Sequence, residues 1–343
     1  MYRAGASGQE TGAEGGPEGE TGGATAAGAT VRRGGRALAP MPKLEIHYAD
    51  HAPLPLPPLH PFPAEKYAAT RRLLLDDGRA DVDGFHPAEP CPTALVLRAH
   101  DADYVARWTT GQATESERRA SGFPWSPEMV VRSLTSVGAT LGAVRSALRH
   151  GVGCSLAGGT HHAGRARASG YCVFNDLAIA TYELLATEAA RAVLIVDLDV
   201  HQGDGTAEIL RDEARAFTFS MHGAKNFPRV KIPSSRDVPL PDGTGDDLFL
   251  STLDAELPGL YDAFRPDFVL YQAGVDPLRN DRLGRLALSH EGLAARDRMV
   301  FESARRRGVP IASAQGGGYG KVLADTVLAH ANVVRAARSV FAG

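Results

Sequence analysis

Acidic and imidazole side chains follow an apolar stretch near the middle of the chain. The segment "VLIVDLDVHQGDG" (193–205) contains Asp197, Asp199, His201 and Asp204. Residues two apart on an extended segment point to the same side. Asp199 and His201 therefore form a carboxylate–imidazole pair suited to a hard or borderline metal ion. For such a pair alone, ordinary loop hydrogen bonds are the alternative, and the other motifs of the chain favour the metal.

A second apolar run supplies the candidate for a third ligand. A catalytic zinc ion usually takes three protein ligands and keeps one position open for water. Asp276 in "VLYQAGVDP" follows directly on an apolar stretch, as Asp199 does. We therefore predict a metal site made of Asp199, His201 and Asp276.

Two consecutive histidines follow a pair of glycines in "CSLAGGTHHAG". These histidines are His161 and His162, and Asp197 and Asp204 are the carboxylates that can accept a ring N–H from them. Such a contact fixes the tautomer of the ring and raises its basicity. Two His–Asp dyads beside a metal would supply a general base and a second acid or electrostatic group. For the histidine pair alone, a structural role is the alternative.

Two tyrosines follow glycines in the sequence. Tyr319 lies in "GGGYG" (316–320), where a tight loop could present its hydroxyl to a developing oxyanion. Tyr171 follows Gly170 in "ASGYCVFND" and could form a wall of an apolar tunnel. For each tyrosine, packing in the core is the alternative.

The elements that position these residues share one pattern. Five times an apolar run ends and polar or Gly-rich residues follow, in "CSLAGGTHHAG", "LIVDLDVHQGDG", "FTFSMHG", "VLYQAGVDP" and "PIASAQGGGYG". Ligands of open α/β sheets bind outside the carboxyl ends of the strands, so these ends can meet at one crevice. Strands that alternate with helices predict an α/β fold, with a mostly parallel sheet covered by helices on both faces.

Local patterns predict individual elements and a boundary. "LEIHYA" (44–49) and "ALVLRA" (94–99) read as strands, and 126–150 reads as a helix with Ser126 as its N-cap and Gly151 at its end. Residues 1–40 are rich in Gly, Ala, Glu and Thr and poor in large apolar residues. We expect a disordered low-complexity tail over 1–40 and one catalytic domain over 41–343.

Taken together, the motifs resemble the signature blocks of a known family. "GGTHHAG", "DLDVHQGDGT", "SMHG", "AGVDPL", "DRLGRLALS" and "GGGYGK" are similar to those of the zinc-dependent histone deacetylases, most of all class IV and related bacterial members. The resemblance covers the chain from about Leu44 onward. It implies a single-domain arginase/deacetylase-like α/β fold.

The resemblance also implies a role for each site residue. Zn²⁺, with Fe²⁺ as the alternative, would be held by Asp199, His201 and Asp276. His162 paired with Asp204 would be the general base, His161 paired with Asp197 the second histidine, and Tyr319 the oxyanion donor. Gly170, Tyr171 and Phe227 would line the tunnel. A structural K⁺ would be bound by Asp197, Asp199 and Ser220 and by the carbonyls of His201 and Met221. Lys66 in "HPFPAEK" stands where class I members carry an arginine of the acetate channel.

The implied activity is hydrolysis of the amide of N-ε-acetyl-lysine, or of longer acyl-lysines, in a protein or peptide substrate. One alternative is a deacetylase of small acetylated amines such as acetylpolyamines, which needs an acidic residue at the tunnel mouth. An alternative of a different class is an inactive acyl-lysine-binding scaffold. The complete set of required residue types argues against the scaffold.

Composition limits the remaining classes of function. The formal net charge is only −3, which gives no basis for nucleic-acid or membrane binding. Cys91, Cys154 and Cys172 form no CxxC pair, and two of them lie among apolar residues. With no secretory signal or membrane-spanning run in the sequence, we expect a cytoplasmic location.

Overall fold

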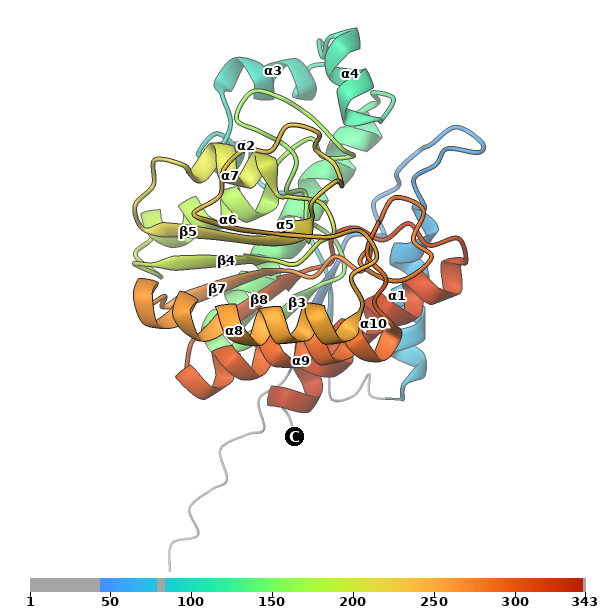
Figure 1. Cartoon of the computed structure of the whole chain (residues 1–343). Helices are drawn as coiled ribbons and strands as arrows, with labels where there is room; N and C mark the ends of the chain where they lie inside the picture. Colours follow the sequence, from blue (N-terminus) through green and yellow to red (C-terminus); the bar gives the residue numbers. More distant parts are fainter. Residues whose placement is uncertain (1–43, 79–83, 342–343) are drawn as a thin grey trace, which may run out of the picture. The chain divides into compact units, whose positions relative to one another are not determined.

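The structure is a computed structural model that describes residues 44–78 and 84–341 (Figure 1). The tail predicted over 1–40 lies outside the described residues.

Strands and helices alternate along the described chain. The strands are β1 Glu45–Tyr48, β2 Gly84–Pro87, β3 Val152–Ser155, β4 Val193–Asp197, β5 Ala216–Gly223, β6 Arg236–Leu240, β7 Phe268–Gln272 and β8 Ile311–Ala314. The helices are α1 Glu65–Asp76, α2 Thr93–Val96, α3 Ala102–Thr109, α4 Glu115–Ser121, α5 Pro127–His150, α6 Asp176–Ala186, α7 Asp204–Leu210, α8 Asp246–Phe264, α9 His290–Arg307 and α10 Leu323–Phe341. No helix among the described residues is long and apolar enough to span a membrane.

The described strands form one sheet. Its order is β2-β1-β3-β8-β7-β4-β5-β6, and each neighbouring pair is parallel. The predicted parallel α/β fold is therefore confirmed. The five strand ends singled out in the sequence belong to β3, β8, β7, β4 and β5, which are consecutive neighbours in the sheet. All five therefore open on one stretch of its carboxyl edge.

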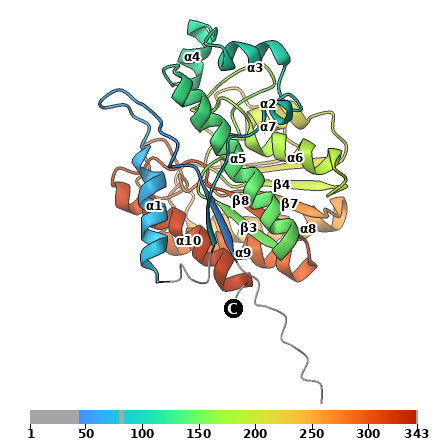
Figure 2. The ribbon, with the colours of Figure 1, turned by 180° about the vertical axis from the view of Figure 1, so that it is seen from behind.

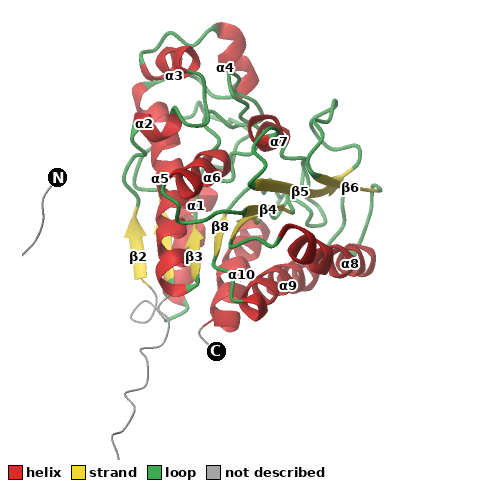
Figure 3. Ribbon diagram, turned by 90° about the vertical axis from the view of Figure 1, so that its left-hand side faces the viewer, coloured by secondary structure: helices red, strands yellow, loops and turns green. Residues whose placement is uncertain are grey.

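Helices cover both faces of the sheet. Strand β4 shows why: Leu194 and Val196 join one apolar core, whereas Val193 and Ile195 join the other. The first core is closed by α8, α9 and α10, and the second by α5 and α6 (Figures 1 and 3). Seen from behind, α5 crosses the sheet and α1 lies beside α10 (Figure 2). Strands with two buried faces explain the continuous apolar runs in the sequence.

Helix α5 begins and ends as its sequence predicts. Ser126 Oγ accepts a hydrogen bond from the Met129 N–H at 3.1 Å, and Pro127 occupies the first turn. Gly151 ends the helix with φ of +83°, in the left-handed region that glycine tolerates.

The strand predicted over 94–99 is wrong. This segment contains helix α2 and a following turn, in which the His100 N–H bonds the Val96 carbonyl at 3.0 Å. Only Val96 and Ala99 are fully buried among its residues, at a helical spacing of three. Four apolar residues in a row fit either structure, and packing against α6 decides for the helix.

Candidate active site

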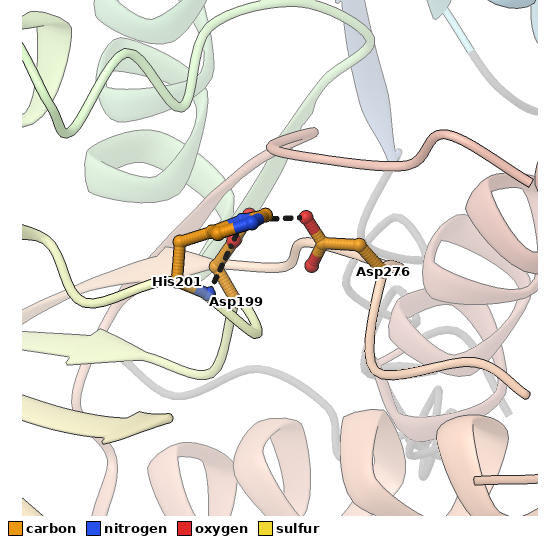
Figure 4. Close-up of side chains that lie close together, drawn as sticks. All are labelled: Asp199, His201 and Asp276. Atoms are coloured by element: carbon orange, nitrogen blue, oxygen red, sulfur yellow. Dashed lines mark hydrogen bonds and ion pairs between the residues drawn. The ribbon is translucent and has the colours of Figure 1, made fainter. Parts of the chain in front are cut away.

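A buried cluster of three side chains lies at the carboxyl ends of β4 and β7 (Figure 4). Asp199, His201 and Asp276 each offer a ligand atom, and these atoms all lie within 4.8 Å of one another. His201 Nδ1 is 3.0 Å from Asp199 Oδ1 and 3.1 Å from Asp276 Oδ2. The three residues predicted as metal ligands are thus brought together.

The electrostatics of this cluster fit a cation. Burial opposes charge on His201, but Asp276 and Asp199 outweigh it and raise the pKa of the ring to about 10. Burial and Asp199 raise the pKa of the Asp276 carboxyl to about 7. Asp276 Oδ2 is buried, and its polar contact at 3.1 Å is with the ring of His201, the imidazole of the same cluster. A metal ion would bind that oxygen and compensate the two carboxylates, and one nitrogen with two oxygens suits Zn²⁺ or Fe²⁺.

Glycines make room for the carboxylates. A Cβ atom on Gly274 would collide with Asp199, and one on Gly317 would collide with Asp276. The Gly317 N–H also donates to Asp199 Oδ2 at 2.8 Å. Gly317, the middle glycine of "GGGYG", is therefore explained by close approach of this loop to the predicted ligands.

A buried arginine holds the backbone next to two of the ligands. Arg296 of α9 donates from Nη1 to the carbonyls of Leu198 and Gly274, at 3.2 and 2.6 Å. Its charge is balanced by Asp297, which accepts from Nε and Nη2 at 2.9 and 2.7 Å. Sequence reasoning missed Arg296. The signal was a charged residue between Leu293 and Val300, on the apolar face of a helix.

The histidine pair forms the two predicted dyads. His161 Nδ1 lies 2.7 Å from Asp197 Oδ2, and His162 Nδ1 lies 2.6 Å from Asp204 Oδ1. The Asp204 carboxylate is shared, because its second oxygen accepts from Arg167 Nη2 at 2.8 Å. Arg167 was also missed, although it follows the histidine pair closely in "THHAGRARASG".

The two histidines differ in protonation. For His161, Asp197 and Asp199 outweigh burial and raise the pKa to about 9. For His162, burial and the neighbouring His161 lower the pKa to about 4, against the opposing pull of Asp204. A neutral His162 that donates its Nδ1 proton to Asp204 keeps an Nε2 lone pair, which suits a general base. Asp199, His201, Asp276, His161 and His162 are called the floor of the site below.

The tyrosine of the "GGGYG" loop reaches the same cavity. Tyr319 is 8% exposed, and its ring lies 5.8 Å from that of Tyr171. Burial, with Asp276 and Asp199, raises the pKa of its phenol well above the ordinary value, so the phenol keeps its proton. Behind it, Lys66 is buried and donates to the carbonyls of Gly316 and Gly318 at 3.2 and 3.3 Å. Lys66 therefore supports the loop that carries Tyr319.

The predicted tunnel residues line a passage to the floor. Gly170 lies between His162 and Phe227, since a Cβ atom there would meet both rings. The Phe227 ring stands 4.9 Å from that of His162, edge to face. Tyr171 stands 5.1 Å from Phe62, an aromatic that sequence reasoning missed. The sequence signal for Phe62 was its position between two prolines in "HPFPAEK". The prolines disfavour a helix there, so packing on the apolar face of a helix does not account for this aromatic ring.

Two cavities meet along this passage. An inner cavity of about 40 Å³ and an outer one of about 690 Å³ share lining residues from the floor and the walls. The shared residues are His162, Gly170, Tyr171, His201 and Tyr319. The outer cavity therefore leads to the imidazoles and the phenol that could act on a substrate.

The residues predicted for potassium lie on or directly after the neighbouring strands β4 and β5. Asp197 of β4 pairs in register with Ser220 of β5, and Met221 is the next residue. The Ser220 hydroxyl hydrogen-bonds His222 Nδ1 at 2.9 Å. The potassium site stays a prediction.

Known proteins match the part of the chain that builds this site. The profile of the histone deacetylase domain matches residues 60–334. An uncharacterised protein of Picosynechococcus sp. is 43% identical over 296 residues, which cover 86% of this chain and 98% of that protein. Histone deacetylase 2 of Arabidopsis thaliana is 28% identical over 305 residues, covering 84% and 79% of the two chains. Histone deacetylase B of Dictyostelium discoideum is 30% identical over 286 residues, covering 76% and 66%.

Proposed function

The chain belongs to the histone deacetylase family and is a deacetylase, and from this premise we propose a metal-dependent hydrolase of N-ε-acyl-lysine. One observation carries the proposal. A buried acid–imidazole cluster, His162 and Tyr319 all surround the end of a single passage. That arrangement suits amide hydrolysis, which needs an activated water and a donor for the oxyanion.

Asp199, His201 and Asp276 would hold the metal ion, with Zn²⁺ proposed and Fe²⁺ as the alternative. When bound, such an ion polarises the amide carbonyl and lowers the pKa of a water molecule. The three buried ligand atoms, all within 4.8 Å of one another, support this assignment. We extend the proposal to a structural K⁺ at Asp197, Asp199 and Ser220, with the carbonyls of His201 and Met221.

The protein's own side chains would carry out the proton transfers and stabilise the oxyanion. His162 Nε2 takes a proton from the attacking water, while Asp204 holds the other ring nitrogen. The Tyr319 hydroxyl donates to the carbonyl oxygen as its negative charge develops. His161, held by Asp197, is the second imidazole beside the reacting centre. A histidinium then protonates the lysine amine as it leaves.

The passage supports a lysine side chain as the leaving group. The rings of Tyr171 and Phe227, with Gly170 between Phe227 and His162, offer an apolar path for four methylenes. An acetylpolyamine would need a carboxylate at the mouth, and no Asp or Glu is among the described residues that line the outer cavity. This lining favours acyl-lysine over the polyamine alternative.

We further propose that acyl groups longer than acetyl are removed. A second small cavity, of about 40 Å³, adjoins the passage at Phe62 and Tyr171 and is lined mainly by apolar side chains. Each methylene buried there would contribute about 0.8 kcal/mol.

The test is hydrolysis of a neutral acetyl-lysine peptide by the metal-loaded protein, beside N⁸-acetylspermidine and peptides with longer acyl groups. We expect turnover of the peptides, and its loss after chelation with recovery on adding Zn²⁺ or Fe²⁺. Turnover of the polyamine alone would contradict the acyl-lysine proposal. Full activity after complete metal removal would contradict the metal site.

A further inference from the structure

The outer end of the substrate passage carries positive charge. Arg119, Lys225 and Arg285 line the outer cavity of about 690 Å³, and no carboxylate is found among its described lining residues. These three cations are called the rim below. The whole chain has a formal net charge of −3, so the positive charge of the rim differs in sign from the net charge of the protein.

The loops that bear the rim are themselves cationic. The segment 224–231 contains Lys225, Arg229 and Lys231 and no acidic residue. The segment 279–285 contains three arginines and one acid, Asp281, whose carboxylate accepts backbone N–H groups of Leu283, Gly284 and Tyr319. The Asp281 carboxylate is thus engaged by the backbone of its own loop and of the loop that carries Tyr319.

Nearby acids compensate the rim only in part. A single carboxylate, Asp242, serves both Arg285 at 3.3 Å and Lys225 at 3.8 Å. Glu115 pairs with Arg119 at 2.6 Å one helical turn away, and both side chains are largely exposed. An excess of positive charge therefore surrounds the mouth. A negatively charged group of the substrate would pair with rim cations that the nearby acids neutralise only in part.

We propose that the rim selects acyl-lysines with negative charge on neighbouring residues and rejects cationic acylated amines. The inference rests on the proposed acyl-lysine hydrolysis and adds the substrate class to it. An acyl-lysine that fills the passage leaves its own backbone at the mouth. Residues one or two positions away then lie within about 4 to 7 Å of that backbone, close to the rim.

The same geometry assigns substrate capture to the mouth of the passage and the chemical step to the floor. Phe227 and Leu283 line the outer cavity beside the rim and offer apolar contact to the substrate. The cations touch no reacting atom, so they act on capture of the substrate and leave the chemical step unchanged. The expected signature is a change in KM and kcat/KM at nearly constant kcat.

The experiment compares three acetyl-lysine peptides of equal length, with Asp, Asn or Lys on both sides of the acetyl-lysine. We expect kcat/KM to be about three- to tenfold higher for the Asp peptide than for the Asn peptide, since exposed ion pairs contribute modestly. The Lys peptide should fall below the Asn peptide by a similar factor. Free N-ε-acetyl-lysine, beside its carboxamide, tests whether the nearest α-carboxylate has the same effect.

Charge removal at the rim provides the variant test. The double substitution K225Q/R285Q should bring the Asp and Asn peptides to within about twofold of each other, while kcat for the Asn peptide stays unchanged. The matched control is R191Q: Arg191 is exposed and lies two residues before β4, at the amino ends of the strands. It should keep the full preference.

The outcomes separate this inference from the function on which it rests. Equal kcat/KM for the three peptides, or a preference that survives K225Q/R285Q, would overturn the rim inference and leave the acyl-lysine activity standing. Failure to hydrolyse the Asn peptide with metal-loaded protein would overturn both.

Discussion

The floor and the rim are two ends of one passage, and charge behaves differently in each. Asp199 and Asp276 in the floor are 0% exposed, whereas the side chains of Lys225 and Arg285 are 76% and 57% exposed. A charge in the floor has little water to compensate it, so removing one partner leaves the others unsatisfied. A charge at the rim is solvated and screened in any case. The degree of burial, and not the number of charges, therefore sets how strongly a substitution at each end of the passage affects activity.

The sharpest test of this contrast is Asp199→Asn. The variant keeps the shape of the side chain but removes a charge that the proposed metal ion needs, so we predict loss of both the metal and measurable turnover. Metal analysis and a peptide assay measure the two losses. Asp254→Asn, an exposed position on α8, is the control that should change neither. Retained activity in Asp199→Asn would show that the floor does not hold the catalytic metal.

The next largest effect concerns the dyads. We predict that His162→Ala lowers kcat by about 10²–10⁴-fold, the usual contribution of a positioned general base, while the metal stays bound. His161→Ala should have the milder effect, and His51→Ala, an exposed site, none. The comparison of kcat and metal content among the variants checks this. The reverse order of severity would assign the base to His161.

Removal of the Tyr319 hydroxyl, beside the floor, should have an intermediate effect on kcat. Tyr319→Phe should lower kcat by about 10²–10³-fold, or about 2.7–4 kcal/mol, because the lost donor acts mainly in the transition state. KM should change little, and the decrease in kcat should be smaller for an activated trifluoroacetyl-lysine substrate. Tyr261→Phe on α8 is the matched control. Wild-type kcat in Tyr319→Phe would mean that another group stabilises the oxyanion.

Burial should also be visible in the pH dependence of stability, away from the floor. Burial lowers the pKa of His100 to about 4, and its Nε2 accepts the Asn175 N–H at 2.9 Å. A histidine pKa that is lower in the folded state contributes stability that is complete above about pH 6.5 and declines as the pH falls toward about 4. The melting temperature should therefore fall over this range. His100→Gln should weaken that dependence, and an unchanged profile in this variant would exclude His100 as its source.

The smallest effect belongs to the rim. Raising the ionic strength from about 0.05 to about 0.5 M shortens the Debye length from roughly 14 to roughly 4 Å. We predict that kcat/KM for the Asp-flanked peptide decreases by a few fold, and that the value for the Asn-flanked peptide hardly changes. A preference that is insensitive to salt would mean that the rim is desolvated in the complex, as the floor is.

Sequence reasoning was most successful where local pattern and chemistry agree. Apolar runs with polar ends predicted the parallel sheet, and the spacing of Asp199 and His201 predicted two groups that do lie together. These features depend on side-chain periodicity and on the chemistry of residue types, which one stretch of chain contains in full. The helix over 127–150 was predictable for the same reason, since its capping residues are adjacent in the sequence.

Other features were decided only by tertiary structure. Residues 94–99 contain the end of helix α2 and a turn because of what they pack against. Phe62 enters the passage from a proline-rich segment far from Tyr171 in the sequence. The opposite protonation of His161 and His162 depends on burial and on Asp199, and the sharing of Asp204 depends on Arg167. The excess charge of the rim arises where separate loops meet. In each case the free energy depends on distance and solvent exposure, and neighbours in space set these quantities.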